Sequence, residues 1–298
     1  GVVGTVKVFM ELVKFEHSIF ALPYAYIGAL YGAAWSGGAN DWVTAEGWPT
    51  LASLFWITLV MVGARSFAFV VNRAVDKEID ARNPRTAGRA VPAGLVKAWE
   101  LWFFAAIVFA VFVFAVWQLQ PITRLLWPFV IVAFLVYPYT KRFTWLCHYW
   151  LGLCLGLAPV GAWVAVTGEV LAWQPWALGL AVALWTAGFD IIYATQDVEC
   201  DERDGVHSVP ADLGVAAGLT QTRALHMLTV MLLVVFGAGV HAGWAWYVGI
   251  GIATILLGYE NALVKPDDLS RVNAAFFTTN GVIAMVVFAG ALVDRVLA

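Results

Sequence analysis

The side chains best suited to chemistry lie in one stretch from Asn72 to Gly94, NRAVDKEIDARNPRTAGRAVPAG. Asn72, Asp76 and Asp80 are four residues apart, so they share one face if the preceding apolar helix continues for two more turns. A segment rich in Pro and Gly, typical of a loop, then carries three arginines: Arg82, Arg85 and Arg89. Carboxylates that suit a hard cation, beside guanidinium groups that suit an anion, indicate a metal–phosphate site.

A second acidic stretch, DIIYATQDVECDERDGVHSVPADLG, runs from Asp190 to Gly214. Asp197 and Asp201 repeat the four-residue spacing, and both stretches lead into a loop with the sequence Val-Pro-Ala. An offset of 121 residues overlays the two pairs of aspartates and places Tyr193 at the position of the first-half asparagine. We therefore predict an internally duplicated chain with a site where its halves meet.

Electrostatics indicate what such a site must contain. Four carboxylates about 5 Å apart repel by about 3 kcal/mol per pair at an effective dielectric near 20, so cations must balance them. Two Mg²⁺ ions would offset four carboxylates, and Lys141, Arg85 and Arg89 could then balance a diphosphate. Mg²⁺ is favoured over Ca²⁺ because it commonly combines a few carboxylates with substrate phosphate oxygens. A solvated pair of helix ends is the simpler alternative, but two matched clusters favour a site.

One charged residue lies inside the apolar helix that leads to each cluster, about two turns before it. Arg65 precedes Asn72 and Asp190 precedes Asp197. A charge near the centre of a membrane helix costs about 2.5–3.5 kcal/mol on insertion scales, so each needs a partner or a polar cavity. The two residues could form a structural ion pair with each other, or they could form a polar floor beneath the metal site.

Composition places these elements in a membrane. The 298-residue chain is 62% hydrophobic and only 12% charged, with a net charge of −3 and a mean hydropathy of +0.80. In soluble domains roughly a quarter of the residues are charged, so this composition indicates a polytopic, all-α membrane protein. The chain also lacks the excess of basic residues typical of a nucleic-acid-binding protein. Its three cysteines have no metal-ligand spacing, and we interpret them as free thiols. The start shows no basic region followed by a cleavage site, so we expect the first hydrophobic segment to remain as a membrane helix.

Hydrophobic stretches close to the roughly 20 residues of a membrane span divide the chain into nine predicted helices. They are expected at about 17–35, 50–71, 99–118, 125–140, 146–166, 176–195, 224–240, 245–260 and 273–294. With the N-terminus in the cytoplasm, 14 of the 17 Lys and Arg residues fall on the cytoplasmic side; Arg124 and Arg295 fall on the other side and Arg65 lies within a helix. Both acidic clusters then face the cytoplasm.

The combined motifs resemble the UbiA superfamily of intramembrane prenyltransferases, over the whole chain. The resemblance rests on Asn72-x-x-x-Asp76-x-x-x-Asp80, Tyr137-x-x-x-Lys141 and Asp190-x-x-Tyr193-x-x-x-Asp197-x-x-x-Asp201, followed by Gly205 and Ser208. KFEHSIFALPYAYIGAL and DARNPRTAGRAVPAG look most like the 4-hydroxybenzoate polyprenyltransferase-like branch, which includes futalosine-pathway menaquinone enzymes. Glu199 and Cys200 stand where many relatives have two aspartates, which affects details of the second metal shell.

The resemblance implies a bundle of nine transmembrane helices forming one domain over residues 1–298. Its related halves would be about 10–140 and 141–298, and its active-site loops, 72–97 and 196–223, would lie on the cytoplasmic side of a prokaryotic inner membrane. It also implies Mg²⁺-dependent transfer of a polyprenyl group from polyprenyl diphosphate to a ring carbon of an aromatic carboxylic acid. The acceptor would be 4-hydroxybenzoate or 1,4-dihydroxy-6-naphthoate, in ubiquinone or menaquinone biosynthesis.

Site roles carry over residue by residue. The implied metal ligands are Asn72, Asp76, Asp80, Asp197 and Asp201. The implied diphosphate ligands are Lys14, Arg85, Arg89, Lys141 and Arg142. The implied acceptor site is Arg65, which would hold the carboxylate, with Asn72, Tyr137, Asp190 and Tyr193. Asp76, Asp80, Asp197, Asp201, Lys141 and Asp190 would be catalytic. The two tyrosines would stabilise an allylic cation through their ring faces, or would simply be interfacial residues.

Three alternatives remain from the sequence. A transporter or channel could bind ions at charged helix ends, although its charges should lie near the bilayer centre with access from both sides. A lipid phosphotransferase of the CDP-alcohol type should show an Asp-Gly-x-x-Ala-Arg motif, which this chain lacks. A UbiA-family member with another lipophilic acceptor would share every motif above.

Overall fold

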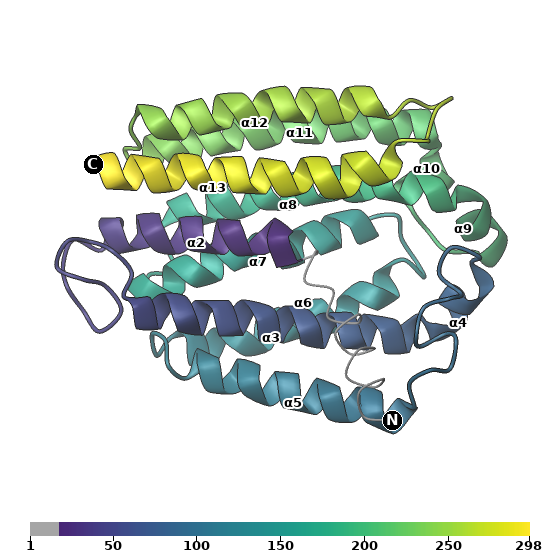
Figure 1. The fold of residues 1–298 in the computed structure, drawn as a ribbon, viewed down its shortest axis with the longest axis horizontal. Helices are drawn as coiled ribbons and strands as arrows, with labels where there is room; N and C mark the ends of the chain where they lie inside the picture. Colours follow the sequence, from purple (N-terminus) through teal and green to yellow (C-terminus); the bar gives the residue numbers. More distant parts are fainter. Residues whose placement is uncertain (1–17) are drawn as a thin grey trace.

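The computed structural model describes residues 18–298 and is all-helical (Figure 1). Nine long helices form its body within these residues: α2 (Ser18–Trp35), α3 (Leu51–Val75), α5 (Ala98–Val116), α6 (Thr123–Thr140), α7 (Cys147–Thr167), α8 (Trp173–Ala194), α11 (Val215–Gly239), α12 (Trp244–Leu263) and α13 (Asn280–Leu297). Five short elements are α4 (Lys77–Arg82), the 3₁₀ helix η2 (Thr195–Asp197), α9 (Val198–Asp204), α10 (Val209–Leu213) and the π-helix η3 (Ala274–Thr279).

Each predicted hydrophobic stretch forms one of the long helices, so hydropathy locates the body of the protein correctly. Seven segments of residues 18–298 have the length and hydropathy of a membrane span. They contain α3, α5, α6, α7, α8, α11 and α13. The helices α2 and α12 do not meet the combined criteria of length and hydropathy. The chain is therefore an integral, all-helical membrane protein, and the nine-span count stays a prediction.

The helices α7 and α8 form the centre of the bundle (Figure 1). Trp163 on α7 and Trp185 on α8 are fully buried. A side-chain carbon at Gly152 of α7 would lie 2.2 Å from the carbonyl oxygen of Ala183 on α8, so only glycine permits this approach of the two backbones. Small residues at helix contacts are the usual way in which membrane helices pack closely.

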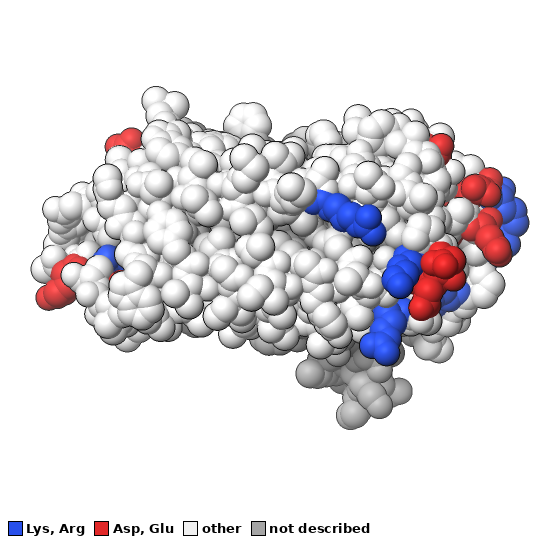
Figure 2. Space-filling view, turned by 90° about the horizontal axis from the view of Figure 1, so that it is seen from above, with Lys and Arg blue, Asp and Glu red and all other residues white. Residues whose placement is uncertain are grey.

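The outer surface matches a lipid environment between two polar ends. Large apolar side chains such as Phe103, Phe129 and Ile255 are more than half exposed. Figure 2 shows Asp, Glu, Lys and Arg gathered mainly at the two ends of the long axis, with a largely uncharged band between them. Since the long helices run along this axis in Figure 1, the uncharged band covers their middle parts.

The short helices that follow the two acidic motifs lie at the same end of the molecule. The element α4 follows α3, and η2 and α9 follow α8 in the corresponding way. Figure 1 places α4, α9 and α10 together at one end of the bundle. The fold therefore brings the two motifs, which are 121 residues apart in sequence, to one site.

Candidate active site

One cavity of about 770 Å³ joins the charged end of the bundle to its apolar interior. Its inner part is lined by apolar side chains, among them Phe112, Trp127, Leu157 and Val164. The predicted site residues on its wall are Arg65, Asn72, Asp76, Asp80, Arg85, Arg89, Tyr137, Lys141, Asp190, Tyr193, Asp197 and Asp201. Two predicted residues are not among them, since Arg142 does not line this cavity and Lys14 lies outside the described residues. The cavity suits a ligand with a charged head and a long apolar tail.

The first motif forms because helical hydrogen bonding continues past the end of α3. The Asp76 amide donates to the Asn72 carbonyl at 2.9 Å, and the Asp80 amide donates to the Asp76 carbonyl at 2.8 Å. All three side chains consequently line the cavity, as the four-residue spacing predicts. Asp80 accepts hydrogen bonds from Arg73 at 3.0 Å and from Arg89 at 3.1 Å.

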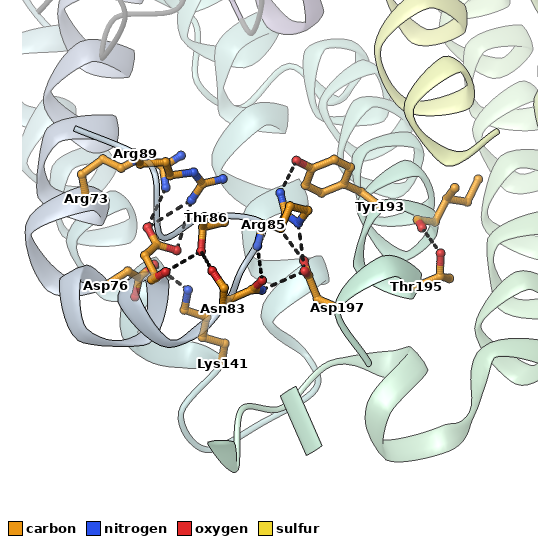
Figure 3. A network of polar contacts seen from close by, with 12 residues as sticks. Arg73, Asp76, Asn83, Arg85, Thr86, Arg89, Lys141, Tyr193, Thr195 and Asp197 are labelled. Atoms are coloured by element: carbon orange, nitrogen blue, oxygen red, sulfur yellow. Dashed lines mark hydrogen bonds and ion pairs between the residues drawn. The ribbon is translucent and has the colours of Figure 1, made fainter. Parts of the chain in front are cut away.

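The Asp76 carboxylate is buried against the start of the α6–α7 loop. Lys141 donates to its Oδ2 at 2.5 Å, and an Arg142 nitrogen lies 3.7 Å from its Oδ1 (Figure 3 shows the lysine contact). Burial raises the pKa of the Asp76 carboxyl above its ordinary value, although the Lys141 ammonium opposes the shift. Arg142 also donates to the Val75 carbonyl at 2.9 Å, so it supports the helix end from outside the cavity.

The second motif is bound to the loop that follows the first. Arg85 donates to both oxygens of Asp197, at 2.9 and 2.6 Å, and to the Tyr193 hydroxyl at 2.8 Å. Asn83 adds a hydrogen bond to Asp197 at 2.9 Å. Figure 3 shows these groups converging from the two halves of the chain, with Arg85 between Asp197 and Tyr193. The contacts of Asn83 and Arg85 therefore hold the segment that follows the first motif against Asp197 of the second motif.

The loop after the second motif is fixed by local signals in the sequence. Gly205 ends α9 with a positive φ of 65°, which favours glycine, and the Ser208 hydroxyl caps α10 by accepting from the Ala211 amide at 3.2 Å. Between them, the His207 amide donates to the Lys141 carbonyl at 2.7 Å. This bond connects the second motif to the lysine that contacts the first.

Asp190 does not pair with Arg65. Its Oδ2 lies 2.7 Å from Nδ1 of His148, whereas Arg65 makes no hydrogen bond or ion pair with residues 18–298. Of the two possibilities that the sequence leaves open, the structural ion pair is thus excluded. Arg65 is a cation on the cavity wall, and Asp190 is held by a neighbouring histidine.

Two oxygen atoms of the first motif suit a divalent cation. Oδ1 of Asn72 and Oδ1 of Asp76 are buried without a hydrogen-bond partner, on successive turns of the same face. Oxygen atoms of this kind are the ligands that Mg²⁺ takes from proteins. Among the described residues, this site included, no three acidic, His or Cys side chains are already gathered for a metal, and Asp80 and Asp197 are paired with arginines. The first motif therefore offers two unpartnered oxygens that fit a cation, whereas Asp197 of the second motif would have to release Arg85 before it could bind one.

Three site residues were missed by the sequence reasoning. Arg73 lies two helical turns before its partner Asp80, a spacing that could have been noticed. Asn83 follows the first motif directly, but its target, Asp197, is 114 residues away. His148 has no local signal of this kind, since its partners are a carboxylate 42 residues away and a backbone amide 61 residues away.

The fold and the site together define an all-helical membrane protein whose cavity is charged at one end and apolar inside. The model of the UbiA prenyltransferase family matches residues 24–282, so the chain belongs to this family and is a prenyltransferase. The resemblance read from the sequence is thereby confirmed.

Curated relatives cover most of the chain. A 4-hydroxybenzoate octaprenyltransferase from Vibrio cholerae serotype O1 is 32% identical over 256 residues, which are 85% of this chain and 88% of the relative. Another protein of the same name, from Saccharophagus degradans, is 30% identical over 270 residues, 90% of this chain and 89% of the relative.

Solved structures share the fold. A UbiA homologue from Aeropyrum pernix K1, in its apo form, superposes with a TM-score of 0.83 at 33% identity and covers 94% of this chain and 98% of its own. A UbiA homologue from Archaeoglobus fulgidus bound to GPP and Mg²⁺ has a TM-score of 0.68 at 19% identity, covering 97% of this chain and 99% of its own. The second likeness establishes the fold alone.

Proposed function

We propose that this protein transfers a polyprenyl group from polyprenyl diphosphate to a ring carbon of an aromatic carboxylic acid in quinone biosynthesis. The first candidate acceptor is 4-hydroxybenzoate, after the names of the relatives, and 1,4-dihydroxy-6-naphthoate is the second. The observation that carries the proposal is Arg65, a cation on the cavity wall that has no ion-pair partner in residues 18–298. An aromatic carboxylate supplies both the missing anion and an apolar body.

The carboxylates of both motifs would hold the divalent cation. The proposed ligands are Asn72, Asp76, Asp80, Asp197 and Asp201, and two ions would balance their charge. The homologue from Archaeoglobus fulgidus is bound to GPP and Mg²⁺, which supports this choice of ion. When bound, Mg²⁺ supplies Lewis-acid stabilisation of the charge that develops on the leaving diphosphate.

The cationic residues around the motifs would bind the diphosphate. Arg85, Arg89 and Lys141 are now paired with Asp197, Asp80 and Asp76. When carboxylates take up metal ions, these cations become available for phosphate oxygens, to which arginine and lysine bind strongly. Arg142, behind Asp76, and Lys14 complete the proposed set of diphosphate ligands. The cations thus act as counter-ions to the carboxylates before substrate binds and to the diphosphate afterwards.

The reaction follows from this arrangement. The allylic C–O bond breaks, diphosphate leaves with the electron pair, and the aromatic acceptor attacks the resulting allylic cation through a ring carbon. Tyr137 and Tyr193 line the cavity on the path of the cation, where aromatic faces stabilise positive charge. The stacking of the Tyr193 ring on Phe276, with centroids 4.1 Å apart, would keep the ring in place for this role. Asp190 is the proposed acceptor of the proton that the ring loses.

Membrane topology completes the proposal. All nine long helices would cross the membrane, in two related halves of about 10–140 and 141–298, with the N-terminus in the cytoplasm. The corresponding succession of α3 and α4, and of α8, η2 and α9, supports the duplication. The excess of Lys and Arg at the end that carries the motifs supports a cytoplasmic active site.

The proposal is tested with purified protein in lipid nanodiscs, supplied with Mg²⁺ and a polyprenyl diphosphate. The acceptors are 4-hydroxybenzoate, 1,4-dihydroxy-6-naphthoate and the decarboxylated counterpart of each, and products are identified by mass spectrometry. We expect C-prenylated product from one or both acids and little from the decarboxylated compounds. Prenylation of the decarboxylated compounds alone would contradict the proposed acceptor class.

A further inference from the structure

His148 connects Asp190 on the cavity wall to the loop that follows the second motif. It lies in the first turn of α7, and its side chain is only 4% exposed. Its Nδ1 lies 2.7 Å from Oδ2 of Asp190 on α8. Its Nε2 accepts a hydrogen bond of 3.1 Å from the backbone amide of Val209, the first residue of α10.

These contacts determine where the imidazole carries its proton. An amide N–H can only donate, so the lone pair of Nε2 is engaged by Val209 and that nitrogen carries no hydrogen. A neutral imidazole holds one proton, which must then be on Nδ1. The Nδ1–H group therefore donates to Asp190, and Asp190 must accept it with an unprotonated oxygen.

The same geometry leaves one oxygen of Asp190 without a hydrogen-bond partner among residues 18–298. Oδ2 is anchored by His148, whereas Oδ1 has no hydrogen-bond partner in residues 18–298. The Asp190 side chain is 18% exposed, and the residue lines the cavity together with Arg65. The result is an oriented carboxylate on the same wall as the cation proposed to hold the acceptor.

We propose that His148 is a positioning residue for the proton-transfer step, an inference that rests on the proposed aromatic prenyl transfer. After the allylic carbon has lost its bond to the diphosphate oxygen, the carbon–carbon bond forms between the acceptor ring and that carbon. The ring carbon then holds both the prenyl group and its hydrogen. Asp190 takes that proton, and the C–H bonding electrons restore aromaticity. His148 keeps the accepting carboxylate oriented, and the Val209 amide keeps His148 in the tautomer that donates.

Two substitutions separate this role from a purely structural one. In His148→Asn the amide nitrogen can occupy the position of Nδ1 and still donate to Asp190, but nothing reaches Val209. In His148→Gln the longer side chain can place an oxygen near the position of Nε2 and accept from Val209, but the donor to Asp190 is lost. A structural cap of α10 predicts that Gln is tolerated and Asn is harmful, and the positioning role predicts the reverse.

The measurements are kcat, the KM for the acceptor, the affinity for polyprenyl diphosphate, and the isotope effect with ring-deuterated acceptor. A positioned base contributes about 10²–10⁴-fold to a rate, so loss of its orientation in His148→Gln should lower kcat by roughly tenfold or more. The isotope effect should rise above the wild-type value because proton loss becomes slower. Affinity for the diphosphate should stay within about twofold, because that substrate binds elsewhere, and His148→Asn should retain most activity.

The control is His241→Asn, on the exposed turn between α11 and α12, where a positive φ of 53° suits asparagine. It should behave as wild type in every measurement. Wild-type kcat and an unchanged isotope effect in His148→Gln would overturn the inference, as would a greater loss in His148→Asn. If the wild-type protein prenylates no aromatic acid, the proposed function fails instead, so the two failures are distinguishable.

Discussion

Replacing Arg65 with leucine tests the proposed acceptor site most sharply. The guanidinium lies on α3 beside the cavity and has no ion-pair partner in residues 18–298. Removal of this side chain therefore leaves no described carboxylate without its partner, because Asp190 is bound to His148. We expect Arg65→Leu to fold as the wild type does and to weaken the binding of the acceptor alone.

The magnitude follows from the contact that would be lost. Hydrogen bonds to charged groups contribute about 1.5–3 kcal/mol, and a guanidinium commonly holds a carboxylate through two of them. At 1.4 kcal/mol for each factor of ten, the apparent acceptor constant should rise about 10- to 150-fold. Arg65→Lys keeps the charge without the planar fork and should give a smaller rise.

The assay compares three quantities in the Arg65 variants and in Arg124→Leu, a control near the opposite end of the bundle. Arg124 donates to the Trp117 carbonyl at 3.0 Å and lies over the Trp117 ring, 5.9 Å from its centroid, so its loss should change none of them. The quantities are the melting temperature, the dissociation constant of polyprenyl diphosphate and the apparent acceptor constant. A similar loss in all three for Arg65→Leu would refute the carboxylate clamp.

Three further substitutions probe the surroundings of the site. Tyr193→Phe keeps the ring but removes the hydroxyl contact with Arg85, so we expect about 3- to 10-fold weaker binding of polyprenyl diphosphate in a titration. Gly152→Ala places a carbon against the α8 backbone, and overpacking of this kind should cost about 1–3 kcal/mol of unfolding free energy. Asn280→Leu removes the donor to the fully buried Glu260 and should cost about 1–3 kcal/mol or more, measured by thermal melting.

Each of these expectations has a contrary result. Unchanged diphosphate affinity in Tyr193→Phe would mean that Arg85 needs no support from the hydroxyl. A Gly152→Ala protein as stable as wild type would show that α7 and α8 can separate without loss. Wild-type melting in Asn280→Leu would mean that Glu260 is satisfied without the amide.

Hydropathy and spacing predict much of this protein because a bilayer imposes strong rules on sequence. Spanning helices need long apolar runs, so the long helices are found at their predicted places, and α3 ends only four residues beyond the prediction. The four-residue spacing predicts the shared face of Asn72, Asp76 and Asp80, since the helix period alone determines it.

Local patterns do not predict what depends on long-range contacts. The π-helix η3 is held by the Asn280 side chain, which donates to two carbonyls of that element. The pairing of Arg85 with Asp197 joins residues 112 positions apart. The His148–Asp190 contact likewise exists only because α7 packs on α8. Such pairs require the fold, since nothing within one segment specifies the partner.

The central claim is that both acidic motifs act with Mg²⁺ in prenyl transfer. The most direct measurement is the rate of C-prenylated product formation with and without Mg²⁺, for wild type, Asp76→Asn and Asp197→Asn, all three checked for intact folding. These isosteric changes remove one charge from each motif. Because metal stabilisation of a leaving group amounts to several kcal/mol, we predict Mg²⁺-dependent product in wild type and at least about 100-fold less in each variant. Product formation that needs no Mg²⁺, or that is undiminished in either variant, would contradict the account.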